Sequence, residues 1–95
     1  MKTSVTLDDQ PLAFINSRPP EARRLLRAAL RAVENGGRQP EPLDAEFEGF
    51  YKVKVAHYRL VLQPRPTESG PGWRVLCAEK RNIVYVVFTQ LQGLS

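Results

Sequence analysis

The fold of this chain is constrained most by residues 50–64, FYKVKVAHYRLVLQP. Apolar and basic side chains alternate over residues 51–55, and an alternating apolar set continues over residues 58–63, which is the period of a half-buried strand. Ala56 and His57, between the two runs, fit a two-residue hairpin loop. The stretch therefore predicts two antiparallel strands joined by a tight turn, with their apolar side chains on one face.

The same register places three cations on the opposite face. Lys54 lies opposite Arg59, and Lys52 lies on the same side as Lys54. Like charges directly opposite each other cost roughly 0.2–1 kcal/mol, so the cluster indicates an anionic ligand. The alternative is an ordinary solvated sheet face, where lysine and arginine are common. The basic patch is local, because the net charge is −3 over residues 35–49 and +4 over residues 50–65.

Composition limits the class of protein. The 95 residues, 42% of them hydrophobic, predict a single domain over residues 1–95 with one small core. The net charge of +4 favours polyanionic partners. A single cysteine, Cys77, excludes an internal disulfide, fits a reducing cytoplasm and is expected in the core. No signal peptide and no apolar run of membrane-spanning length is found, so a soluble cytoplasmic protein without membrane contact is expected.

The N-terminal third predicts an edge strand and two helices. Residues 4–8 fit a short strand, and Asp8 and Asp9 are expected to cap a helical turn over residues 10–16. Two prolines before its start and two glycines after its end delimit a helix over residues 21–35. Its apolar stripe consists of Ala22, Leu25, Leu26, Ala29, Leu30 and Val33.

Arginines cover much of the remaining surface of this second helix. They are Arg23, Arg24, Arg27 and Arg31. One interpretation is a solvated surface, and the other is contact with phosphates or with an acidic partner. No second amphipathic helix follows, so the chain does not predict a helix-turn-helix.

The rest of the chain predicts loops and further strands. Residues 38–49 form an acidic loop anchored by two apolar side chains, and residues 63–72, rich in proline and glycine, form a long exposed connection. Residues 73–78 alternate as a third strand, and residues 83–89 (IVYVVFT) predict a further strand or a buried terminal segment. The predicted fold is α+β: a mostly antiparallel sheet of four to five strands with the N-terminal helical pair packed on one face.

The order of motifs along the chain is also informative. A helix ending in glycine is followed by Leu43, residues 49–55 (GFYKVKV), residues 58–62 (YRLVL), a strand, and Lys80-Arg81-x-x-Val84-Tyr85. Over residues 4–85 this order resembles the RelE/ParE toxin superfamily of bacterial toxin–antitoxin pairs. It is most similar to the RelE branch, whose members cleave messenger RNA on the ribosome. The resemblance implies a RelE-like fold, mRNA interferase activity that inhibits translation, and three partners: a cognate antitoxin, mRNA and the ribosome.

The resemblance also implies a set of site residues. The basic cluster and tyrosine of a RelE active site match Lys52, Lys54, Arg59, Arg81 and Tyr85. The ParE branch, whose members poison gyrase, generally lacks this set, which favours the nuclease. The residues expected to contact RNA outside the active site are Lys80, Arg23, Arg27 and Arg31.

The chemistry of RNA cleavage agrees with such a cluster. Attack of a ribose 2′-hydroxyl on the adjacent phosphate gives a 2′,3′-cyclic phosphate, and it requires a base, charge neutralisation and a proton for the leaving oxygen. A lysine crowded by cations releases its proton more easily, so Lys54 is expected to be the base, with Lys52 and Arg59 holding the phosphate. Arg81 would stabilise the leaving group. Tyr85 would stack on or orient a nucleobase.

Some alternatives stay open on the sequence. His57 is a rival acid or base, although it lies on a turn. No cofactor or metal is expected, because one histidine, one cysteine and no paired carboxylates on a common face make no ligand set. The chain fits, alternatively, a toxin-fold module that binds without cleaving, such as a gyrase inhibitor or an inactive homologue, or a basic RNA-binding domain. Only the nuclease requires Lys54, Arg59, Arg81 and Tyr85 to converge.

Overall fold

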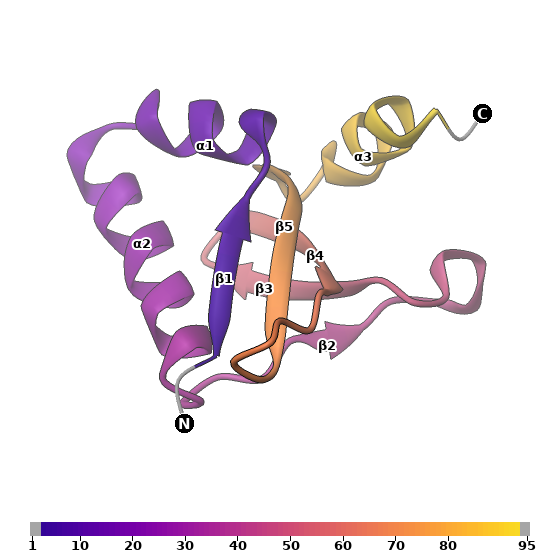
Figure 1. Cartoon of the computed structure of the whole chain (residues 1–95). Coiled ribbons are helices and arrows are strands. Elements are labelled where there is room, and N and C mark those ends of the chain that lie inside the picture. Colours follow the sequence, from indigo (N-terminus) through magenta and orange to yellow (C-terminus); the bar gives the residue numbers. More distant parts are fainter. Residues whose placement is uncertain (1–2, 94–95) are drawn as a thin grey trace.

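The structure of the protein is a computed structural model that describes residues 3–93 (Figure 1). Its elements are β1 (Ser4–Leu7), α1 (Asp9–Asn16), α2 (Pro20–Glu34), β2 (Glu41–Pro42), a 3₁₀ helix (Ala45–Phe47), β3 (Tyr51–Val55), β4 (Tyr58–Pro64), β5 (Gly72–Lys80) and α3 (Val84–Gln92). The strands form an open sheet in the order β1-β5-β4-β3-β2, in which β1 runs parallel to β5 and all other neighbours are antiparallel. The expected α+β fold is confirmed.

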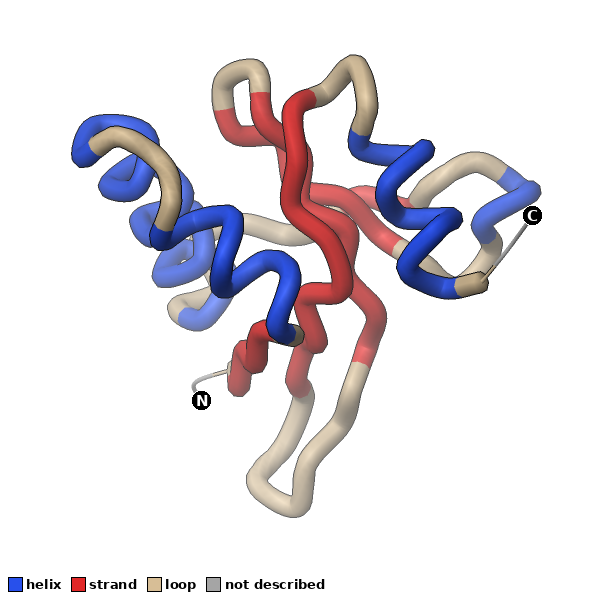
Figure 2. The backbone as a smooth tube through the Cα atoms, turned by 90° about the horizontal axis from the view of Figure 1, so that it is seen from above, coloured by secondary structure: helices blue, strands red, loops and turns tan. Residues whose placement is uncertain are grey.

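The sheet separates two apolar clusters. Figure 2 shows α1 and α2 on one side of the strands and α3 on the other. The cluster under α1 and α2 includes Leu26, Leu30, Val53, Leu60 and Leu62. The cluster under α3 consists of Val61, Leu76, Cys77, Val84 and Phe88. Because both faces are covered here, residues 75–78 of β5 are buried without interruption, instead of alternating as the sequence predicted.

The first strand and helix are attached to β5 by side chains. Asp8 occupies the N-cap position of α1, but its carboxylate does not cap the helix. It accepts two hydrogen bonds from Arg74 instead, from Nε at 2.7 Å and from Nη2 at 2.9 Å. The amide of Gln10 donates to the carbonyl of Ala78 and accepts from its N–H, at 2.8 and 2.9 Å. Gln10 thus continues the ladder along β5 beyond the end of β1.

The second helix follows its predicted boundaries and apolar stripe, with one exception. It begins at Pro20, and Gly36 after its end has a φ of 77°, the left-handed conformation that glycine adopts without strain. Leu26 and Val33 are buried, and burial of such a side chain contributes roughly 1.5–3 kcal/mol. Leu25 was expected to face the core, but 46% of it is exposed because it lies at the border of the stripe.

The hairpin has the predicted register. Lys54 pairs with Arg59, and Val55 pairs with Tyr58 across the two-residue turn. The turn residue Ala56 has a φ of 53°, the left-handed region that the tight hairpin requires. At the far end of β4, the chain continues into the predicted exposed connection. Gly72 closes this loop, where a Cβ would lie 2.4 Å from the carbonyl oxygen of Arg65, so no other residue fits without a shift.

The C-terminal segment was predicted as a strand or a buried terminal segment, and the strand prediction is wrong. Residues 84–92 form α3. β-branched side chains lower helix propensity by less than about 1 kcal/mol each, whereas burying Val84 and Phe88, four residues apart, on the sheet contributes roughly 1.5–3 kcal/mol for each. Within residues 3–93, no helix is long and apolar enough to cross a membrane.

Candidate functional site

Lys54, Arg59 and Glu79 form a row across β3, β4 and β5. Lys54 pairs with Arg59, and Arg59 pairs on its other side with Glu79. Cys77, two residues before Glu79, is buried under α3, so this row lies on the α3 side of the sheet. Lys52, two residues before Lys54, lies on that side too. The predicted basic face therefore exists, and Glu79 adds a carboxylate that the sequence pattern did not assign to it.

The side chains of Arg59 and Lys54 differ in their hydrogen bonds to the rest of the protein. The guanidinium of Arg59 donates through Nη1 to the carbonyls of Ala56 and Tyr58, at 3.0 and 2.7 Å. Lys54 is exposed, and its ammonium donates to no group of residues 3–93, although its carbonyl accepts a hydrogen bond from Arg38. Arg59 is thus oriented in advance, and the ammonium of Lys54 is available to a ligand.

Tyr85, in the first turn of α3, lies at one border of the basic face. Its ring stacks on Phe47, with the centroids 5.8 Å apart and the planes 17° from parallel. Burial raises the pKa of Tyr85; the charge of Arg59 opposes this effect and that of Asp44 adds to it. The phenol therefore stays protonated at neutral pH and is able to donate a hydrogen bond. Phe47 therefore covers one face of the ring and fixes its orientation.

Lys52 and Tyr85 line a pocket of about 180 Å³ with the acidic loop. The other lining residues are Leu43, Asp44, Glu46 and Phe47. Glu41 of β2 lies directly opposite Lys52. Lys52 therefore lies near carboxylates of the acidic loop and of β2, whereas Lys54 lies directly opposite Arg59. The sequence showed that residues 38–49 are acidic, but nothing local indicated that they lie against Lys52.

Arg81 lies at the hairpin end of the basic face. Its backbone N–H donates to the carbonyl of His57 at 2.8 Å, and both side chains are exposed. Since Arg59 binds the carbonyl of Ala56 in the same turn, the backbone of Arg81 lies at the turn that the Arg59 guanidinium holds. The ring of His57 lies 4.1 Å from that of Tyr58, which packs in the cluster under α1 and α2. The imidazole therefore lies on that side of the turn and does not join the basic face, so the sequence expectation of His57 as a rival acid or base is not supported.

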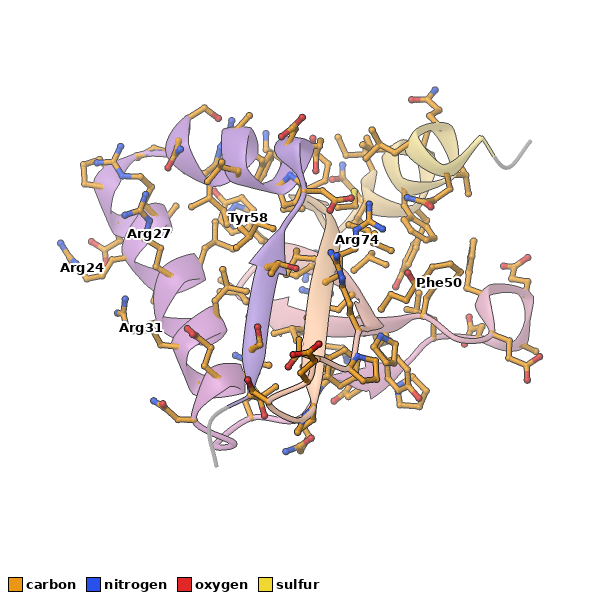
Figure 3. The ribbon with its side chains drawn as sticks, viewed as in Figure 1. Arg24, Arg27, Arg31, Phe50, Tyr58 and Arg74 are labelled. Atoms are coloured by element: carbon orange, nitrogen blue, oxygen red, sulfur yellow. The ribbon has the colours of Figure 1, made fainter. Side chains whose placement is uncertain are left out.

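The other residues that the sequence assigned to RNA do not join this face. Figure 3 shows Arg27 and Arg31, together with Arg24, projecting from α2. This helix also carries Arg23, and it covers the opposite side of the sheet from α3. Lys80 pairs with Tyr58, whose ring lies in the cluster under α1 and α2, so Lys80 leaves the sheet on that side. The sheet thus separates Lys80 and the arginines of α2 from Lys52, Lys54 and Arg59.

Cys77 lies in the core, as expected. It has no exposed surface, and burial raises the pKa of its thiol to about 12, with a smaller effect from the charge of Glu79. A buried neutral thiol is a poor nucleophile. Within residues 3–93, no three histidine, cysteine, aspartate or glutamate side chains gather into a group able to hold a metal ion.

We expect Cys77 to react with iodoacetamide only after unfolding. A pKa near 12 instead of 9 lowers the thiolate fraction at pH 8 roughly a thousandfold, and burial blocks access in addition. The unfolded chain ionises first between pH 9 and 12, so the free energy of unfolding should fall as the pH rises through that range. Mass spectrometry of labelled protein, with and without urea, measures the reactivity. Equal labelling rates in the two conditions would contradict this placement.

The architecture defines a class of fold. An open, mostly antiparallel five-stranded sheet has a helical pair on one face and a C-terminal helix beside a basic hairpin on the other. This is a RelE-like fold, as the sequence resemblance implied.

Similarity to a solved structure supports the assignment of a RelE-like fold. The chain is similar to the crystal structure of the RelBE2 toxin–antitoxin complex from Mycobacterium tuberculosis, with a TM-score of 0.66. The match covers 85% of this chain and 100% of that chain, at 18% sequence identity. No protein-family model matches the sequence, and no curated protein matches it. The similarity thus establishes the fold, and function has to be argued from the site.

Proposed function

We propose that this protein is the toxin of a type II toxin–antitoxin pair and acts as a ribosome-dependent endoribonuclease on messenger RNA. The observation that supports the proposal is the Lys54–Arg59 pair across the hairpin of a RelE-like fold, with the backbone of Arg81 at the hairpin turn and Tyr85 near enough for the charge of Arg59 to affect its phenol. Opposed like charges on an otherwise stable hairpin favour a phosphate ligand.

The proposed reaction is transfer of the phosphoryl group to the adjacent 2′-hydroxyl. Lys54 removes the proton of the 2′-hydroxyl. The 2′-oxygen then attacks phosphorus while the bond from phosphorus to the 5′-oxygen breaks. Arg59, oriented by two backbone carbonyls, and Lys52 stabilise the charge on the phosphoryl oxygens. Arg81 stabilises the negative charge that develops on the leaving 5′-oxygen, and this oxygen takes up a proton from water. The products are a 2′,3′-cyclic phosphate and a 5′-hydroxyl, and the reaction consumes no cofactor or metal.

Tyr85 has a role at the border of the site. Its phenol stays protonated and orients the base next to the cleaved bond through its hydroxyl. The partner of the toxin is a cognate antitoxin in the cytoplasm. The similar structure from M. tuberculosis is itself a toxin–antitoxin complex, which supports this partner.

Expression of the protein without an antitoxin should arrest translation. Primer extension on messages engaged by ribosomes should reveal new 5′ ends, and the upstream fragments should carry 2′,3′-cyclic phosphate. Growth arrest without any cut message would contradict the nuclease and favour a toxin-fold module that binds another target.

A further inference from the structure

The cavity between the acidic loop and Lys52 has a lining unlike that of the basic face. We call it the Asp44 pocket, and its volume is about 180 Å³. At ~30 Å³ per water molecule this volume equals about six waters, which is room for one flat ring system but not for a whole nucleotide. Lys52 and Tyr85, which line the pocket, also belong to the proposed active site. A group bound in the pocket therefore lies beside the reacting phosphate.

Backbone hydrogen bonds and aromatic contacts fix the shape of the Asp44 pocket. The N–H of Phe47 donates to the carbonyl of Asp44 at 2.8 Å, and the N–H of Phe50 donates to the carbonyl of Phe47 at 3.1 Å. The ring of Phe47 contacts the rings of both Tyr85 and Phe88. The acidic loop is thus tied to α3, and the walls of the pocket are formed by the fold itself.

The carboxylates of the pocket are not engaged by the rest of the protein. Asp44 occupies the N-cap position of the 3₁₀ helix, but its side chain makes no capping hydrogen bond. In the part of the chain that the structure describes, the one ion pair is that of Asp8 with Arg74, so Lys52 lies across the pocket without pairing with Asp44 or Glu46. Such carboxylates accept hydrogen bonds from a ligand that offers N–H groups.

Asp44 and Tyr85 present complementary hydrogen-bonding groups side by side. Both line the pocket. Burial raises the pKa of the Tyr85 phenol most, and the charge of Asp44 adds to this effect, as expected for neighbouring groups. The protonated phenol donates one hydrogen bond, and the carboxylate accepts two. The pocket therefore offers one donor beside two acceptors.

Guanine is the nucleobase that matches this order of groups. Its Watson–Crick edge carries one acceptor, O6, followed by two donors, N1–H and the N2 amino group. Adenine and cytosine each have a ring nitrogen acceptor that would face the carboxylate, and uracil has one donor between two carbonyls. A phosphate fits poorly, because the carboxylates repel it. The base, and not the backbone of RNA, is the part that suits the pocket.

We propose that the Asp44 pocket selects guanine at the nucleotide next to the cleaved bond. The carboxylate of Asp44 accepts hydrogen bonds from N1–H and the N2 amino group, and the hydroxyl of Tyr85 donates to O6. Lys52, at the pocket, lies two residues from Lys54, or about 6.6 Å along the strand, which a nucleotide spans between its base and its phosphate. The position of this guanine beside the cut rests on the proposed nuclease function, whereas binding of the base does not.

Binding of nucleoside monophosphates tests the pocket without any cleavage. In ¹H–¹⁵N spectra of the full-length protein, GMP should shift the amide signals of Asp44 and Tyr85. IMP lacks the N2 amino group and should bind at least tenfold more weakly, because one hydrogen bond to a charged group is lost. AMP, which places an acceptor against the carboxylate, should bind no better than IMP.

Asp44→Asn should change which purine fits. The amide keeps one acceptor and gains a donor, so GMP should bind at least tenfold more weakly than to the unchanged protein. XMP carries an oxygen at C2 in place of the amino group, and should bind to this variant more tightly than GMP does. Asp44 is exposed and caps nothing, so the variant should stay folded. Glu48→Gln makes the same kind of change in the same loop but outside the pocket, and should alter GMP binding less than threefold.

Mapping of the cuts in messages gives a second measurement. Guanine should occupy one fixed position beside the cuts, and the Asp44→Asn protein should lose this preference while it continues to cut. Cleavage without a guanine preference would overturn the proposal and leave the nuclease function standing. Guanine-selective binding without any cleavage would support the pocket and contradict the nuclease function.

The binding data alone are able to overturn the proposal. They do so if GMP and IMP bind equally, if GMP shifts signals outside the Asp44 pocket, or if Asp44→Asn and Glu48→Gln weaken GMP binding equally. Binding of N-acetylarginine amide at the same signals, as tight as that of GMP, would assign the pocket to a basic side chain of a partner protein instead.

Discussion

Replacing both Lys54 and Arg81 by alanine should abolish toxicity while leaving the protein folded. Each residue is proposed to act on the scissile phosphate, and loss of one positioned catalytic group lowers the rate by roughly 10²–10⁴. The rate losses from removing two groups that act in the same step are not additive. The cleavage rate of the double variant should therefore be reduced by the same factor as that of a single variant, or by somewhat more. The readouts are growth arrest and primer extension on ribosome-bound messages.

Substitution at these two positions should affect activity without affecting the fold. Both side chains are exposed, and neither donates a hydrogen bond to residues 3–93, so the cost in stability should stay within about 0.5 kcal/mol. Arg59 is less suitable, because its guanidinium holds the hairpin turn. Arg24→Ala removes an exposed arginine from α2, on the opposite side of the sheet, and should retain nearly full toxicity. Full toxicity in the Lys54→Ala/Arg81→Ala protein would eliminate the nuclease assignment.

Phe88→Ala should be the most damaging single change in α3. Phe88 is fully buried, and its ring packs edge-on against Phe50 at 5.0 Å and Phe47 at 5.8 Å. Removing a buried phenylalanine side chain costs about 3–5 kcal/mol, out of a total stability of roughly 5–15 kcal/mol. We expect the melting temperature to fall by more than about 10 °C, as followed by the fluorescence of Trp73, the single tryptophan.

This change should also affect the site. Phe47 packs against Phe88 on one side and stacks on Tyr85, so loss of the Phe88 ring frees both partners of the stack. Val86→Ala is the matched control, because Val86 lies on the same helix with 60% of its surface exposed. It should shift the melting temperature by no more than a few degrees. Similar melting of the two variants would show that α3 does not depend on its buried residue.

The part of the site that was predicted from sequence is the part made by one hairpin. An alternation of period two with a two-residue turn fixes which side chains lie opposite each other, so the sequence predicts the Lys54–Arg59 pair correctly. The surroundings of Lys52 were not predictable in this way. Its neighbours Glu41, Asp44 and Glu46 belong to the acidic segment 38–49. The path of this segment depends on which apolar cluster its own apolar residues pack against.

Local patterns were sufficient to predict a helix over residues 21–35, observed at Pro20–Glu34, together with the hairpin register and the cationic face, because each depends on residues close in the chain. Three other features result from contacts between distant segments: residues 84–92 form a helix, Tyr85 stacks on Phe47, and the arginines of α2 lie on the opposite side of the sheet from the basic face. These outcomes depend on which apolar surfaces remain to be covered once the sheet has formed. Burial of a residue such as Phe88 contributes more free energy than the local preference of its segment, so the second apolar cluster, and not the β-branched composition, set the conformation of the C-terminal segment.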